Sequence, residues 1–144
     1  MSVIVSIISL AQKTKKVANQ GIGGVVLRKS GNLMPSPEVA LTASKGSPIE
    51  REIYVYQLTN ESQTDATKMP FFSKITTKLI AKVKTGRDGK FKIKLPVGYY
   101  SLFTKEKDGL YANQFDDSMN IFMVRVSRRQ WTNIDFLIDY QATY

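Results

Sequence analysis

The sequence predicts a single all-β domain, an antiparallel β-sandwich of seven or so short strands. Apolar and polar residues alternate with a period of two in several segments, which is the pattern of strands that bury one face. Turn-forming residues recur between these segments at short spacing. No stretch sustains the 3.6-residue period of an amphipathic helix. The 144 residues are enough for one hydrophobic core and too few for two of ordinary size.

Three strands are expected in the first half of the chain. Residues 21–27 are rich in valine and end in a turn signal. Residues 39–44 alternate in polarity between proline-containing breaks, where the missing N–H interrupts a sheet ladder. Residues 53–58 are apolar or aromatic on both faces, as expected for a strand inside a sandwich. Residues 60–74 are polar and lack periodicity, so we expect a long loop there, of a kind that is functional or mobile in compact domains.

The clearest element is a predicted β-hairpin. Residues 79–84 and 91–95 alternate in polarity, and Asp88-Gly89 between them suits a turn that requires a positive φ angle. If the two strands pair, their apolar side chains point inward and their lysines share one outer face. This predicted lysine face consists of Lys82, Lys84, Lys92 and Lys94.

Four more strands are expected after the hairpin. They are residues 99–104, 110–114, 121–126 and 132–140, and glycine-containing turns precede the first two. Between the last two lies Trp131, in the run Arg128-Arg129-Gln130-Trp131. This tryptophan is either an exposed binding platform or a turn residue that caps the sandwich, and we expect the second.

The first 19 residues have two interpretations. Residues 3–10 are apolar, and the following small-x-small spacing is one that signal peptidase accepts, so residues 1–19 can be the remnant of a signal peptide with a linker. The same apolar run also alternates as a β-strand would. Both interpretations stay open, and the sandwich domain is expected to span residues 20–144.

The composition narrows the classes of function. The chain has no histidine and no cysteine, which excludes the usual zinc, copper and iron sites, thiol nucleophiles and Ser-His-Asp triads. We therefore expect a protein without a cofactor that is not an enzyme. A hydrolase that uses carboxylates or tyrosines remains as an alternative. The net charge of +9 attracts anionic partners without choosing among them, and no apolar run reaches the roughly 18 residues of a membrane span.

The segment from Val83 to Leu102 follows a recognisable pattern. Its marked positions are Asp88-Gly89, Phe91, Leu95-Pro96, Gly98 and Tyr100. This spacing resembles the central motif of the carboxypeptidase regulatory-like family. The runs Gly24-Val25-Val26 and Asn133-Ile134-Asp135-Phe136 resemble that family's first and last strands.

The resemblance implies a Greek-key sandwich of transthyretin-like or immunoglobulin-like type over residues 20–140. It also implies a secreted, periplasmic or cell-surface bacterial protein, since the tail is similar to secreted variants of the family. In metallocarboxypeptidases the corresponding domain is a non-catalytic appendage. Enzymes on similar sandwiches depend on histidines that this chain lacks.

Two surface features are candidate sites. The lysine face can bind a polyanion, or it can be a solvated surface that limits aggregation, and we favour the second interpretation. Nucleic acid is not expected, because its readers interleave aromatic residues or arginine with such lysines. The oxygen ligands of Asp116, Asp117 and Asn120 can hold calcium, but they match no dense calcium motif, so an ordinary acidic loop is the alternative.

Taken together, these observations predict a non-catalytic exported module that binds a protein or a carbohydrate at the cell surface. A polyanion-binding protein that uses the lysine face is the first alternative, and the hydrolase is the second.

Overall fold

The computed structural model describes residues 18–32 and 46–143. Strands account for 61% of the residues and helix for 3%, which confirms the predicted all-β class. The only helix in the described part is a single 3₁₀ turn, η1 (Glu61–Gln63). The predicted strand at residues 39–44 and the apolar run at residues 3–10 lie outside the described residues.

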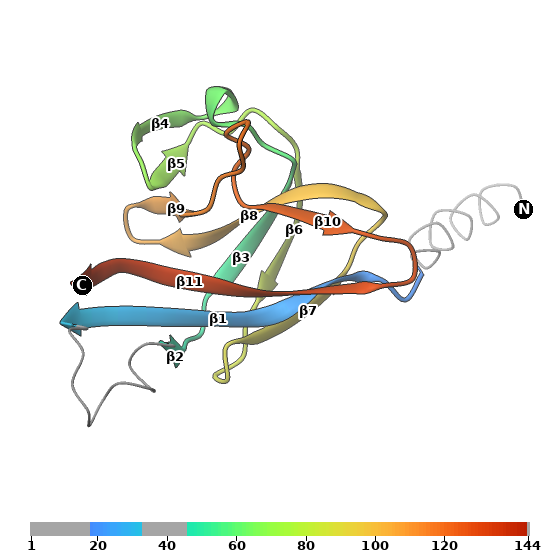
Figure 1. The fold of residues 1–144 in the computed structure, drawn as a ribbon, viewed down its shortest axis with the longest axis horizontal. Coiled ribbons are helices and arrows are strands. Elements are labelled where there is room, and N and C mark those ends of the chain that lie inside the picture. Colours follow the sequence, from blue (N-terminus) through green and yellow to red (C-terminus); the bar gives the residue numbers. More distant parts are fainter. Residues whose placement is uncertain (1–17, 33–45, 144) are drawn as a thin grey trace, which may run out of the picture.

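Four strands form sheet A. Its centre is β1 (Gly21–Asn32), which pairs in parallel with β11 (Trp131–Thr143) on one side. On the other side β1 pairs antiparallel with β7 (Lys90–Lys94) and, further along, with β2 (Ser47–Pro48). Figure 1 shows β1 and β11 side by side and pointing the same way. This parallel pair departs from the predicted purely antiparallel arrangement.

Sheet B contains the other seven strands. They are β3 (Glu52–Gln57), β4 (Asp65–Lys68), β5 (Phe71–Ser73), β6 (Leu79–Lys84), β8 (Gly98–Glu106), β9 (Gly109–Tyr111) and β10 (Met123–Val126). The path across the sheet is β4-β5-β9-β8-β3-β6, and β10 also pairs with β8. The described residues thus form more strands than the seven or so expected.

The core lies between the two sheets. Buried residues alternate in β3 and β10, whereas β8 is buried along most of its length. Ile22 and Val26 of β1 are fully buried, as is Ile53 of β3. The rings of Phe122 and Phe136 stack with their centroids 4.5 Å apart. Figure 1 shows β3 crossing the direction of β1 and β11, so the arrangement is sandwich-like.

The predicted hairpin is wrong, because β6 and β7 pair with different sheets. The β6 strand pairs with β3, whereas β7 pairs with β1. The turn between them forms as expected, with Gly89 at φ 74°. Gly86 N donates to Lys90 O at 3.1 Å within the turn. Other groups of the turn bond to other segments, since Thr85 Oγ1 accepts from Arg51 N at 2.8 Å and Gly89 O accepts from Val26 N at 2.8 Å. The two strands consequently separate at the turn.

The long loop expected at residues 60–74 is also wrong, since the segment folds into η1, β4 and β5. Asn60 caps η1 through its side chain, and the side chain of Gln63 accepts from Asn60 N, so the two residues form a reciprocal capping box. The β5 strand then pairs with β9, and Phe72 is buried against Phe103. This buried ring explains why the segment is ordered.

Candidate binding groove

An open groove of about 840 Å³ crosses the outer face of sheet A. We call it the glycine groove, because Gly23 lies at its centre. Its polar and aromatic side chains on the outer face are those of Lys90 and Lys92 of β7, and of Trp131, Asn133 and Asp135 of β11. These side chains share the outer face because the residues that alternate with them face the other way: Phe91 and Phe136 are buried in the core, and Ile134 packs against it.

The strand register arranges the groove in rows. Gly23 pairs with Asn133 on one side and with Lys92 on the other. In the next row Val25 pairs with Asp135 and with Lys90. One wall therefore carries an amide and a carboxylate, and the opposite wall carries two ammonium groups.

Two neighbouring glycines contribute in different ways. Gly24 has φ 157°, and a Cβ there would lie 1.9 Å from Ile134 O, so only glycine allows β1 to approach β11 this closely. A Cβ on Gly23 would meet nothing nearer than Asn133 Oδ1, at 3.3 Å. The backbone of Gly23 does not demand glycine. Gly23 is buried between its neighbours, and the floor of the groove carries no side chain at this position.

The ring of Trp131 forms one end of the groove. Its Nε1 donates a hydrogen bond to Asn19 Oδ1 at 3.2 Å, which orients the ring. Lys92 Nζ lies 4.2 Å from the ring centroid, reaching across the glycine strand in a cation–π contact. Trp131 is half-buried and begins β11, so it is a wall of a groove and not the predicted turn residue.

A buried glutamine fixes the turn that positions Trp131. Gln20 is 5% exposed; its Nε2 donates to Leu95 O at 3.1 Å, and its Oε1 accepts from Arg129 N at 3.0 Å. Arg129 has φ 57°, a conformation that is uncommon outside glycine. Gln20 thus ties the end of β7 to the turn before β11, and no pattern in the sequence identifies this role.

The structure divides the predicted lysine face. Lys92 lies in the glycine groove, and Lys94 pairs with Gly21 just beyond it. Lys82 and Lys84 are on sheet B, where Lys82 Nζ lies 4.6 Å from the centroid of the Tyr54 ring. Lys84 Nζ lies 3.4 Å from Glu50 Oε1 in an exposed ion pair. The prediction of one face with four lysines is therefore wrong, because β6 and β7 belong to different sheets.

The candidate calcium ligands form an internally bonded loop. Asp116 Oδ1 accepts from the backbone N–H groups of Ser118 and Asn120, each at 2.9 Å, and Oδ2 accepts from Asn120 Nδ2 at 2.9 Å. The hydrogen bonds from the side chain and backbone of Asn120 lower the pKa of the Asp116 carboxyl. Asp117 is exposed beside this loop. Across residues 18–32 and 46–143, no three acidic side chains gather as a metal site would require.

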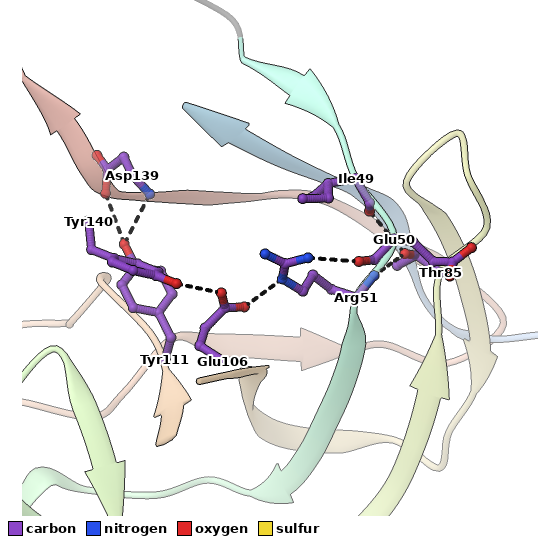
Figure 2. A network of polar contacts seen from close by, with 8 residues as sticks. All are labelled: Ile49, Glu50, Arg51, Thr85, Glu106, Tyr111, Asp139 and Tyr140. Carbon is purple, nitrogen blue, oxygen red and sulfur yellow. Dashed lines mark hydrogen bonds and ion pairs between the residues drawn. The ribbon is translucent and has the colours of Figure 1, made fainter. Parts of the chain in front are cut away.

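Carboxylates and tyrosines do meet elsewhere, in a polar network between the sheets (Figure 2). Glu106 of β8 accepts hydrogen bonds from Arg51 Nε at 2.9 Å and from Tyr140 of β11 at 2.8 Å. The Tyr111 hydroxyl of β9 donates to Asp139 Oδ1 of β11 at 2.9 Å. These five residues, which we call the polar network, join sheet A to sheet B.

The polar network is closed to ligands. The side chain of Glu106 is 1% exposed, and its two oxygens are taken by Arg51 and Tyr140. Burial raises the pKa of the Tyr111 phenol. Burial and, to a smaller extent, the hydrogen bond to Glu106 raise the pKa of Tyr140 to about 12. Both phenols are therefore protonated donors at neutral pH, which suits a structural role.

None of the helices in the described residues has the length and apolar character to cross a membrane. The chain matches no family model, no curated protein and no solved structure. The resemblance to the carboxypeptidase regulatory-like family therefore stays a prediction.

Proposed function

We propose that this protein is a non-catalytic binding module whose glycine groove binds carbohydrate. The observation that carries the proposal is an open groove that has no side chain on its floor at Gly23 and lies between an oriented tryptophan and a row of polar side chains. Binding sites commonly combine one apolar surface with a few placed polar groups. The face of Trp131 suits the apolar C–H surface of a sugar ring, while Asn133 and Asp135 suit its hydroxyls.

The groove favours a sugar over a protein partner. Protein interfaces usually depend on several buried aromatic or aliphatic anchors. Here Trp131 is the one aromatic ring on the outer face of the groove, and the exposed side chains beside it are polar or charged. A hydroxyl-rich ligand can satisfy these groups, whereas an apolar protein surface would leave them unpaired.

A binding role also fits the groove better than hydrolysis does. Glycoside hydrolysis ordinarily requires two carboxyl groups that flank the scissile bond. Asp135 is the only carboxylate among the residues that line the groove. In the polar network Glu106 is buried and Asp139 is half-buried, and both carboxylates are bonded to neighbours within the fold.

The same proposal includes three further properties of the protein. They are export from the cell, membership of the carboxypeptidase regulatory-like family, and a Greek-key topology of transthyretin-like type. Their support is the motif at residues 83–102 and the sandwich-like pair of sheets. A module of this kind would act outside the cytoplasm, where polysaccharides are available as ligands.

The chain carries a built-in reporter for this proposal, since Trp131 is its only tryptophan. We expect at least one polysaccharide of a broad panel to shift the fluorescence of Trp131 in a saturable way. The Gly23→Val variant fills the floor with a residue that strands accept well, so it should abolish that binding and keep the fold. Gly86→Ala, in the exposed turn outside the groove, is the control.

Thermal melts of each variant establish that it is folded. If Gly23→Val does not fold, Asn133→Ala provides a second test, because Asn133 is exposed and lines the groove. Undiminished carbohydrate binding by these variants, or the absence of any polysaccharide that binds, would contradict the proposal.

A further inference from the structure

The cationic wall of the glycine groove indicates what kind of carbohydrate it accepts. Lys90, Lys92 and Lys94 alternate along β7 and are all exposed, which spaces them at intervals of roughly 7 Å. The ion pairs formed by the described residues join Arg51 to Glu106 and Lys84 to Glu50. None of the three lysines of β7 is thus paired with a carboxylate in residues 18–32 and 46–143.

We infer that the ligand of the glycine groove is an acidic polysaccharide, a hydroxyl-rich chain that carries carboxylate groups. The inference rests on the proposed function and narrows its ligand class. A carboxylate on the ligand would meet the free ammonium groups of β7. The hydroxyls of the same sugar would meet Asn133 and Asp135 on the opposite wall.

The contact between Lys92 and Trp131 allows the groove to discriminate between acidic and neutral sugars. Lys92 Nζ covers the ring at 4.2 Å from its centroid. A neutral sugar must compete with this ammonium group for the aromatic face and gains nothing in return. An acidic sugar forms an ion pair with Lys92 as it stacks, and a charge-assisted hydrogen bond is stronger than a neutral one. The groove therefore disfavours neutral sugars as well as attracting acidic ones.

The opposite wall argues against nucleic acid. Single-stranded nucleic acids are bound by grooves in which cations follow the phosphates and several aromatic rings stack successive bases. The glycine groove offers one exposed aromatic ring, and Asp135 stands across Val25 from Lys90. Asp135 can accept hydrogen bonds from the hydroxyl groups of a sugar, which the backbone of DNA does not offer.

A matched pair of lysine variants tests the inference. Lys92→Met removes the charge that lies over Trp131. Lys82→Met removes a lysine of the same kind, which lies 4.6 Å from the centroid of the Tyr54 ring on sheet B. The probes are polygalacturonate, alginate and hyaluronan, each compared with a neutral polysaccharide; for polygalacturonate the neutral partner is its own methyl ester. Trp131 fluorescence and affinity electrophoresis measure binding.

We expect the wild-type protein to prefer at least one of the acidic polymers over its neutral partner by about tenfold, the effect of one charge-assisted hydrogen bond. Lys92→Met should remove this preference without weakening the binding of neutral polymer, and Lys82→Met should keep it. Rising salt should reduce only the affinity for the acidic polymer.

Each alternative outcome overturns a different statement. Equal affinity for neutral and acidic polymers would overturn the inference and leave the proposed function standing. Failure to bind any polysaccharide would overturn both. Tighter binding of single-stranded oligothymidylate than of the acidic polymers, lost in Lys92→Met, would replace the polysaccharide with nucleic acid. An acidic preference that Lys82→Met abolishes and Lys92→Met retains would place the site on sheet B.

Discussion

The polar network and the glycine groove use similar residue types in opposite ways. In the polar network the charges of Glu106 and Arg51 meet inside the fold, 2.9 Å apart. In the glycine groove the charges of Lys92 and Asp135 stand on opposite walls with the glycine strand between them. One region satisfies its charges internally, and the other leaves them facing solvent.

This difference distinguishes polar groups that stabilise the fold from polar groups that are available to bind a ligand. A buried charge requires a partner within the protein, because an unpaired one is costly to desolvate. An exposed charge has no such requirement and is available to a ligand. Changes in the polar network should therefore alter stability, whereas changes in the glycine groove should alter binding. The predictions below test this separation, from the largest expected effect to the smallest.

Glu106→Ala should produce the largest loss of stability, about 2–3 kcal/mol, because it leaves Arg51 and Tyr140 without their buried partner. Urea unfolding measures the change. Lys84→Ala is the control, since it removes an exposed ion pair with Glu50 and should cost no more than about 0.5 kcal/mol. Equal effects of the two substitutions would show that burial does not distinguish the polar network from the surface.

Gln20→Ala should cost about 1–2 kcal/mol and should also weaken binding, because the lost amide leaves Arg129 N unpaired and releases the turn before Trp131. Gln20 is buried but holds the turn that leads into the glycine groove, so stability and binding should decrease together. Gln57→Ala, at an exposed glutamine of β3, is the matched control. A loss of stability in Gln20→Ala with unaltered binding would mean that this turn does not position the tryptophan.

Tyr140→Phe should lower the free energy of unfolding by a smaller amount, about 1 kcal/mol near pH 8, and the loss should depend on pH. The pKa of Tyr140 is raised to about 12 in the folded protein, against about 10 in an unfolded chain. Between these values the unfolded state binds fewer protons, so the free energy of unfolding falls as the pH rises. The stability contributed by the phenol is complete below pH 10 and is lost as the pH approaches 12.

Chemical unfolding of the wild type and of Tyr140→Phe across this pH range checks the prediction. Because phenylalanine cannot ionise, the difference between the two proteins should shrink as the pH increases. A constant difference from pH 8 to pH 12 would contradict the role given to the Tyr140 hydroxyl in the polar network.

Most strands could be predicted from the sequence, but their partners could not. The alternation in β6 and β7 correctly assigns Val83 and Phe91 to the core side and Lys82 and Lys92 to the outside. Period-two alternation identifies the buried face of a strand and says nothing about which strand lies beside it. Hydrogen bonds from Arg51 and Val26 to the connecting turn decide that the two strands separate.

The same limit applies to the glycine groove. The sequence indicates Lys92 and Trp131 as candidates, but as members of separate features, and it does not single out Lys90, Asn133 or Asp135. Their association depends on the register of β1 with β7 and β11, which sets Gly23 between Lys92 and Asn133. Glycine in a strand suggests a bulge or a close approach of another backbone; only the surrounding atoms distinguish Gly24, which fits that expectation, from Gly23.

Quenching of Trp131 fluorescence in the free protein tests the central claim most directly, because it needs no ligand. An open groove with a cationic wall should admit small solutes and concentrate anions beside the ring. At low ionic strength we therefore expect iodide to quench several-fold more efficiently than caesium, and Lys92→Gln to reduce this ratio while Lys82→Gln leaves it unchanged. Quenching that is negligible, or as efficient with caesium as with iodide, would contradict an accessible tryptophan beside unpaired lysines.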